Sequence, residues 1–260
     1  MYNKKFYEEL YQDEQGKNSF EVRSKTEAFK FLIKKKGIYV NKKVVLDIGF
    51  GSGNILEILK KSGAICYGVE ISQVAIDRLK KKGYRLKLAH GTILPYKKRF
   101  FDIVISSHTI EHVREEKKIL EEIKRVLKPK GVFIMGVPTG KFKNPLHYRN
   151  YSENDIKRLS YYLGLDCIYS RNFGSPLFKL IYSFIRDMTS IMTRNGQSEL
   201  NKVNSYNKNE FYRVSRLLYH KVVVNLLIFL YLIDSRLINN SGIEIWFIFC
   251  KNRLVSNNYK

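Results

Sequence analysis

The chain has 260 residues, 44% of them hydrophobic, and a formal net charge of +23 from 47 lysines and arginines against 24 acidic residues. This length and composition exclude a disordered or fibrous protein and favour one enlarged domain with a sizeable core. The three cysteines (Cys66, Cys167 and Cys250) are odd in number and lack C-x-x-C spacing, so we expect no disulfide framework and no metal site.

The first half of the chain alternates short apolar runs with helical stretches. The first 24 residues are polar with scattered aromatics. They lack the apolar core of a signal peptide, and they predict a short helix or cap in a cytoplasmic protein. The pattern that follows is typical of a parallel sheet covered by helices on both faces. The predicted helices span residues 25–36, 54–62, 73–82 and 115–127, and the predicted strands span residues 44–49, 65–70, 84–89, 102–106 and 132–137.

The second half is less regular. Ser152 followed by Asp155 predicts the start of a helix that runs to residue 163. Strands are predicted over residues 165–169 and 243–250, and the roughly 70 residues between them are far more than a hairpin loop needs. We therefore predict a helical insertion. The predicted organisation is a sheet domain of residues 1–173 and 242–260 with an insertion over residues 174–241.

One segment of the predicted insertion bears on membrane contact. Val222–Ile233 is apolar except for Asn225, but it is shorter than the about 20 residues that span a bilayer. Arg216, Lys221 and Arg236 flank it. Two interpretations stay open: a lid that packs on the sheet domain or on a second subunit, and a helix that lies peripherally at the inner membrane surface.

The positive charge has three interpretations. The lysines and arginines occur in separate short runs at residues 34–36, 80–82, 97–99 and 117–118, which favours a solvated surface. Anionic lipid and RNA stay open as partners. Nucleic acid is the less expected of the two, because no appended RNA-binding domain is recognisable. The oligomeric state is not determined by the sequence.

A glycine-rich loop follows the first predicted strand. Gly49, Gly51 and Gly53 alternate with other residues, so the backbone there can turn sharply and approach a ligand closely. Glu70 ends the next predicted strand, where a carboxylate would meet a ribose. Asp47 precedes the loop and would repel a pyrophosphate, but it suits a ligand with ammonium and sulfonium charge. These features predict S-adenosylmethionine as the cofactor and leave NAD as the alternative.

Four segments in order resemble the class I S-adenosylmethionine-dependent methyltransferases, in particular their small-molecule branch. VLDIGFGSG resembles their first motif, and YGVEIS resembles their second. HGTILPYKKRFFDIVISSHTIEHV is similar to the third and fourth motifs, and LKPKGVFIMGVP is similar to the strand that follows. The resemblance covers Val44–Pro138. It implies a doubly wound α/β fold with a mostly parallel seven-stranded sheet and an antiparallel last strand, here with the helical insertion between the last two strands.

The resemblance also implies roles for the cofactor-binding residues. The backbone of Gly49, Gly51 and Gly53 would meet the methionine part of the cofactor, and Asp47 would orient the loop or the ammonium group. Glu70 would accept both ribose hydroxyls.

Other residues would surround the adenine and the methyl group. Ile71 would cover one face of the adenine. Many relatives have an acid after the glycine that corresponds to Gly91, whereas this chain has Thr92 and then Ile93. We expect a hydroxyl or the backbone to hold the adenine instead. Ser106 ends the fourth strand, where the methyl group would face the acceptor.

Methyl transfer to a hydroxyl needs positioning and a general base. The candidate catalytic residues are His112, which follows the fourth predicted strand, and His147, which lies in a loop resembling the substrate side of related enzymes.

The sequence supports three functional hypotheses. The first is a methyltransferase that modifies an oxygen of a small, saccharide, quinone-like or lipid-linked acceptor. The second is an RNA methyltransferase, which predicts steeply salt-dependent RNA binding. The third is a non-catalytic scaffold of the same fold that docks on a membrane or a partner through the insertion.

Overall fold

A computed structural model of the chain describes residues 7–9, 11, 20–139, 146–174, 224–237 and 243–250. The chain divides into two compact units, Met1–Arg171 with Glu244–Lys260, and Asn172–Ile243. Most of the second unit lies outside the described residues. The domain organisation expected from the sequence therefore stays a prediction, as do the helices expected between residues 175 and 223.

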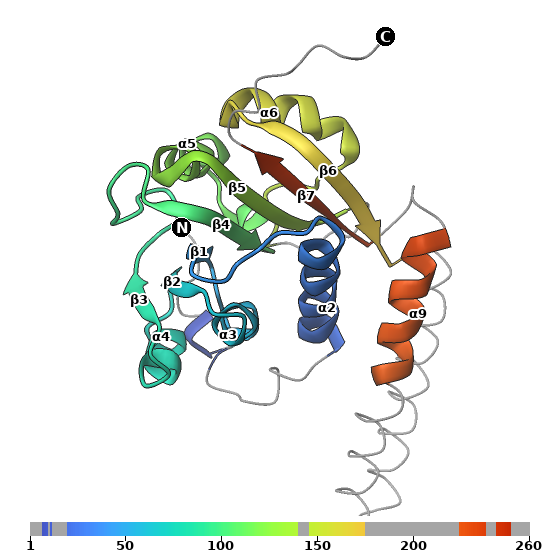
Figure 1. The fold of residues 1–260 in the computed structure, drawn as a ribbon, viewed down its shortest axis with the longest axis horizontal. Coiled ribbons are helices and arrows are strands. Elements are labelled where there is room, and N and C mark those ends of the chain that lie inside the picture. The colour runs from blue at the N-terminus through green and yellow to red at the C-terminus, as the bar shows by residue number, and fades with distance from the viewer. Residues whose placement is uncertain are drawn as a thin grey trace, which may run out of the picture. The chain divides into compact units, whose positions relative to one another are not determined.

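The described residues form a seven-stranded sheet in the order β3-β2-β1-β4-β5-β7-β6 (Figure 1). β1 pairs in parallel with β2 and β4, β2 with β3, and β4 with β5, whereas β7 runs antiparallel to β5. The α/β fold with an antiparallel last strand is thus confirmed. The strands are β1 (Val44–Ile48), β2 (Ile65–Glu70), β3 (Arg85–Leu88), β4 (Phe101–Ser107), β5 (Leu127–Pro138), β6 (Asp166–Phe173) and β7 (Glu244–Cys250).

Helices cover both faces of this sheet. Figure 1 shows α2, α3 and α4 on one side and α5 and α6 on the other. The apolar faces of these helices pack on the strands, because a sheet of this kind is buried on both faces. The helices are α2 (Phe20–Lys35), α3 (Asn54–Lys61), α4 (Gln73–Lys80), α5 (Glu116–Val126), α6 (Ile156–Leu163) and α9 (Val224–Leu237), with 3-10 turns η2 (Ile110–His112) and η3 (Glu153–Asp155).

The centre of the core lies where β5 pairs with β7. Five consecutive residues of β7, Ile245–Phe249, are fully buried. Gly136 of β5 stands opposite Trp246, and a Cβ atom on this glycine would lie 2.5 Å from the indole ring. The glycine therefore leaves the space that the largest buried side chain of the core occupies.

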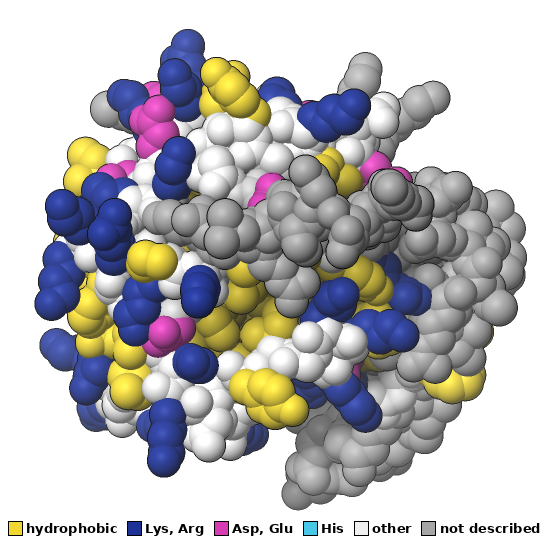
Figure 2. All heavy atoms as spheres, turned by 45° about the horizontal axis from the view of Figure 1, so that its top comes forward, with side chains coloured by type: hydrophobic (Ala, Val, Ile, Leu, Met, Phe, Trp, Pro, Cys, Tyr) yellow, Lys and Arg dark blue, Asp and Glu magenta, His cyan; other side chains and the backbone are white. Residues whose placement is uncertain are grey.

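The apolar run in the predicted insertion forms α9, whose Tyr231 stacks on Phe173 within the second unit. Among the residues that the structure describes, no helix has the length and apolarity to cross a membrane. Figure 2 shows lysine and arginine side chains scattered over the visible face, with few acidic side chains between them.

Candidate functional site

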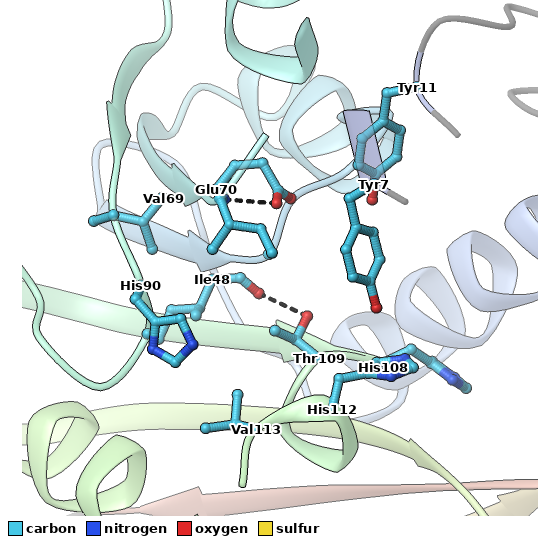
Figure 3. A pocket seen from close by; sticks show the side chains of 14 residues that line it. Tyr7, Tyr11, Ile48, Val69, Glu70, His90, His108, Thr109, His112 and Val113 are labelled. Atoms are coloured by element: carbon cyan, nitrogen blue, oxygen red, sulfur yellow. Dashed lines mark hydrogen bonds between the residues drawn. The ribbon is translucent and has the colours of Figure 1, made fainter. Parts of the chain in front are cut away.

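The glycine loop connects the end of β1 to the start of α3. Gly49, Gly51 and Gly53 all have positive φ angles, of 70°, 50° and 79°. A Cβ atom on Gly49 would also lie 2.2 Å from the hydroxyl oxygen of Thr109. That hydroxyl donates a hydrogen bond of 3.1 Å to the carbonyl of Ile48 (Figure 3). The loop therefore approaches the chain that follows β4 so closely that only glycine fits at residue 49.

Glu70 at the end of β2 is tied to this loop. Its carboxylate accepts hydrogen bonds from the backbone N–H of Gly51 at 3.0 Å and of Ile71 at 2.7 Å, and a longer one from Ser72. Burial raises the pKa of the Glu70 carboxyl, and these N–H donors oppose the shift because they stabilise the charged form. The carboxylate is held in one orientation and lines a pocket.

The pocket lies at the carboxyl ends of β1, β2 and β4, the edge where ligands bind in open α/β sheets. The empty space inside it, open solvent included, is about 550 Å³. Ile48, Val69 and Val113 give it apolar walls, while Glu70 and Thr109 contribute polar groups (Figure 3). An apolar pocket with one oriented carboxylate suits an adenosine with its ribose hydroxyls.

The structure places three of the expected cofactor residues, Gly49, Glu70 and Ile71, in the wall of this pocket. Gly51 and Gly53 lie behind them: the first donates its N–H to Glu70, and the second caps α3. All five roles stay predictions for the bound cofactor.

The other expected cofactor residues do not line the pocket. Asp47 is buried in β1, and its Oδ1 atom has no hydrogen-bond partner among the described residues. Burial, with the nearby charge of Glu70, raises its pKa to about 8. Ser106 is fully buried in β4, Ile93 is 76% exposed, and the hydroxyl of Thr92 lies 2.8 Å from Nδ1 of His90. Since His90 itself lines the pocket, Thr92 can affect a ligand there by orienting the His90 ring.

Two tyrosines near the N-terminus also line the pocket, and the sequence interpretation did not single them out. The rings of Tyr7 and Tyr11 stack with centroids 6.3 Å apart, and Tyr7 meets the His112 ring edge-on (Figure 3). Between them, Glu8 accepts hydrogen bonds from the Ser72 hydroxyl at 2.6 Å and from backbone N–H groups in the first turn of α4. The i, i+4 spacing of the tyrosines on a helix was the available signal.

His112 and His147, expected as catalytic candidates, lie side by side although 35 positions separate them. Their ring centroids are 4.7 Å apart. Nδ1 of His112 lies 3.0 Å from the carbonyl oxygen of Leu146. Because a carbonyl only accepts, Nδ1 carries the proton and the lone pair is on Nε2. Burial lowers the pKa of His112 to about 4, so the ring is neutral at neutral pH and has a lone pair that can accept a proton or bind a cation.

A buried carboxylate that the sequence interpretation missed faces these histidines. Glu111 is fully buried in η2, and its Oε1 lies 3.9 Å from Nε2 of His112 and 3.5 Å from Nδ1 of His108. Burial raises its pKa to about 8. The other nitrogen of His108, Nε2, lies 2.9 Å from Glu244, and that carboxylate accepts from Nε1 of Trp246. The available signal was an acid directly before His112.

His108 takes a costly backbone conformation at this point. Its φ angle of 52° is uncommon for a residue with a side chain. Strained residues persist where the surrounding structure holds them and concentrate at functional sites. His108 joins the pocket, which it lines, to the carboxylates of Glu111 and Glu244.

Comparison with known proteins identifies the sheet domain. Residues 46–135 match a family model described as a methyltransferase domain. The chain is 34% identical to tRNA (carboxymethyluridine(34)-5-O)-methyltransferase from Arabidopsis thaliana over 36% of this chain and 24% of that protein. It is 31% identical to ubiquinone biosynthesis O-methyltransferase from Coxiella burnetii over 40% of this chain and 47% of that protein. The chain thus spans less than half of the length of either relative.

A solved structure extends the likeness in fold. The crystal structure of a putative sarcosine dimethylglycine methyltransferase from Galdieria sulphuraria superposes with a TM-score of 0.58 at 15% identity, over 87% of this chain and 85% of that one. At this identity the likeness concerns the fold. Since the sheet order, the oriented carboxylate at the end of β2 and the matched domain all agree, residues 46–135 form a methyltransferase domain with the fold of the class I S-adenosylmethionine-dependent methyltransferases, whose methyl donor is S-adenosylmethionine.

Proposed function

We propose that the protein transfers a methyl group from S-adenosylmethionine to a hydroxyl oxygen of a small, saccharide, quinone-like or lipid-linked acceptor. The observation that carries this proposal is the neutral imidazole of His112, which lines the pocket, next to the buried Glu111 carboxyl. A hydroxyl needs a base as it becomes a nucleophile, whereas a thiolate or a neutral amine does not need one to the same degree. The tRNA and ubiquinone enzymes compared above are both named as O-methyltransferases, which supports an oxygen acceptor.

Some residues of the pocket bind the cofactor, and others take part in proton transfer. When bound, S-adenosylmethionine supplies an electrophilic methyl carbon on its sulfonium sulfur. Glu70 holds the ribose, and the apolar side chains of Ile48 and Val69 exclude water from the adenosine. Tyr7 and Tyr11 line the pocket from the N-terminal segment.

His112 then acts on the acceptor. Its Nε2 atom would accept the proton of the acceptor hydroxyl, and bound S-adenosylmethionine would supply the methyl group to the acceptor oxygen, with S-adenosylhomocysteine as the leaving group. In its ionised form, the Glu111 carboxylate would stabilise the resulting imidazolium, because its Oε1 lies 3.9 Å from Nε2. Positioning of the three reacting atoms in line supplies much of the rate.

Methyl transfer from labelled S-adenosylmethionine into fractionated lipid, glycan and RNA extracts tests this proposal. We expect label in a lipid or small-molecule fraction, bound through a base-stable ether, and a loss of about 100-fold or more in His112→Ala. Ser62→Ala, a change at the end of α3 away from the pocket, is the control and keeps the rate. Label on nitrogen, or an unchanged rate in His112→Ala, would contradict the proposal.

RNA is the second candidate acceptor, because the net charge of +23 and one relative named as a tRNA methyltransferase favour it. It predicts label in the RNA fraction and RNA binding that weakens steeply with salt. The lysine and arginine side chains drawn in Figure 2 are spread over the described part of the visible face. If no fraction takes up label, the non-catalytic scaffold is favoured instead.

Peripheral membrane contact belongs to the same proposal, because a lipid-linked acceptor lies at a membrane surface. The apolar helix α9 supports it. Co-sedimentation with anionic and with zwitterionic vesicles at low salt is the test. Binding to the anionic vesicles alone supports contact through the basic surface, and no binding to either counts against it.

A further inference from the structure

Three side chains with metal-ligating atoms meet at the edge of the pocket. Glu111 and His112 belong to η2, and His147 follows it in the chain by 35 positions. One ligand atom from each lies within 4.8 Å of the others. Atoms held about 2.0–2.1 Å from one Zn²⁺ at tetrahedral angles are about 3.3 Å apart, so a small change of side-chain torsions brings all three onto one ion.

The surroundings of Glu111 point to a ligand that the protein itself does not supply. The residue is fully buried, and neither of its carboxylate oxygens has a hydrogen-bond partner among the described residues. A buried carboxyl group without hydrogen bonds is costly, and such groups in folded proteins usually contact an ion or water. A cation between this carboxylate and the two imidazoles would satisfy it.

The tautomer of His112 fits the same arrangement. The N–H of Nδ1 donates to the carbonyl of Leu146, which places the lone pair on Nε2, and Nε2 lies 3.9 Å from Oε1 of Glu111. Metal-ligating histidines almost always donate their other N–H to a carbonyl or carboxylate in this way, which sets the orientation of the ring. The backbone next to His147 thus orients the ring of His112 for a cation.

We propose that Glu111, His112 and His147 form a binding site for a divalent transition cation of the Zn²⁺ type, with an open coordination position toward the pocket. Two imidazoles and one carboxylate are the ligand set of catalytic zinc sites, which leave a position for water or substrate. Mg²⁺ prefers oxygen ligands and retains its waters, so the two imidazoles select against it.

The role of this cation rests on the proposed function. The pocket side of the site is where an acceptor hydroxyl would lie, because His112 lines the pocket. A hydroxyl on the open position loses its proton to water more readily, since the cation lowers its pKa. His112 is then a ligand, and the cation takes over the task assigned above to His112 as the base. An acceptor with a phenolic or neighbouring second hydroxyl suits such a site.

Metal titration of the chelator-treated full chain tests the site without cofactor or acceptor. We expect one equivalent of Zn²⁺ to bind in calorimetry, and Co²⁺ to give visible absorption bands of a low-coordinate nitrogen and oxygen site. Glu111→Gln and His147→Ala weaken binding by about tenfold or more. His90→Ala is the matched control, because His90 lines the same pocket but lies outside the cluster.

Three results would overturn the proposal: no binding of Zn²⁺ or Co²⁺, binding that survives both substitutions in the cluster, or tighter binding of Mg²⁺ than of Zn²⁺. Circular dichroism of each variant shows whether it folds. If Glu111→Gln does not fold, the metal binding of His147→Ala and His147→Asn tests the proposal without it. Because the readout is binding of the metal alone, a failed methyl-transfer assay leaves this result intact, and a failed titration leaves His112 as the base.

Discussion

Two buried carboxylates of the pocket region differ in what surrounds them. Glu70 accepts hydrogen bonds from three backbone N–H groups, which favour its charged form and orient it for a ligand. For Glu111 the effect of burial is larger than that of its own backbone N–H, and the carboxyl faces two imidazoles. The first suits hydrogen bonding to ribose hydroxyls, and the second suits binding of a proton or a cation.

Substitution of Glu70 tests its role in cofactor binding. Glu70→Ala should weaken S-adenosylmethionine binding by about 10- to 100-fold, because hydrogen bonds to a charged group are worth about 1.5–3 kcal/mol. Isothermal titration calorimetry measures this directly. Glu57→Ala is a matched control, since that carboxylate lies on the exposed face of α3 in an ion pair with Lys61. An unchanged affinity of Glu70→Ala for S-adenosylmethionine would contradict a role of Glu70 in cofactor binding.

Asp47 gives a prediction about pH and stability. Its pKa is raised to about 8 in the folded protein, so between its ordinary value and pH 8 the folded state holds a proton that the unfolded state has lost. Its contribution to stability is fully present at low pH and is lost as the pH rises through about 8. Asp47→Asn, which cannot ionise, should therefore gain stability relative to the wild type between pH 5 and pH 8.

Urea unfolding at pH 5, 6.5 and 8 measures this difference. A full pKa difference contributes about 1.4 kcal/mol per pH unit, so a gain of at least about 2 kcal/mol across the range is expected. A difference in stability that stays constant across the three pH values, whatever its size, would mean that the pKa of Asp47 is not raised in the folded protein.

At the level of elements, the pairing of β5 with β7 depends on a glycine that leaves room for a large side chain of the neighbouring strand. Gly136 lies in register with Trp246, and the indole ring occupies the space of a missing side chain. β7 is thus packed into the sheet between β5 and β6, where its apolar residues are buried on both faces. The position of β7 in the sheet also places Glu244, its first residue, within hydrogen-bond distance of His108.

Gly136→Ala tests this packing. The new methyl group would lie 2.5 Å from the ring, so we expect a loss of about 1–3 kcal/mol in the free energy of unfolding. Trp246→Phe makes room and should recover part of the loss in the double variant, although it also removes the hydrogen bond to Glu244. Denaturant unfolding of the two single variants and the double variant completes the cycle. Strict additivity would mean that the glycine is not required by the tryptophan.

At the level of the whole molecule, the charge of +23 affects stability as well as partners. Like charges spread over one surface repel one another, and salt screens this repulsion over about 10 Å at 0.1 M. The melting temperature should therefore rise by a few degrees between 20 mM and 300 mM sodium chloride. Differential scanning calorimetry measures the shift, and the same range of sucrose serves as an uncharged control. A fall in melting temperature with salt would mean that attractive ion pairs outweigh the repulsion.

Most of the fold followed from the sequence because it is encoded in short windows. Apolar runs such as Val44–Ile48 alternate with helical periods, and most of these elements form close to their predicted bounds. Three bounds were wrong: α2 begins at Phe20 and not at residue 25, β5 begins at Leu127 and not at residue 132, and β6 ends at Phe173 and not at residue 169. The glycine loop and Glu70 were recognisable for the same reason, since their spacing along the chain reflects one strand–turn–helix–strand unit. The expectation of no metal came from cysteine spacing, which carries no information about histidines from separate segments.

By itself the sequence determined the sheet class, the cofactor loop and the candidate histidines, because periodicity and local spacing act over a few residues. Only the tertiary structure decided which distant groups share one place. It put Tyr7 and Tyr11 over the pocket, and it brought His147 to the buried Glu111 and His112. The physical reason is that such contacts depend on the paths of whole loops and on which side chains the folded core buries. The spacing of residues along the chain determines neither of these.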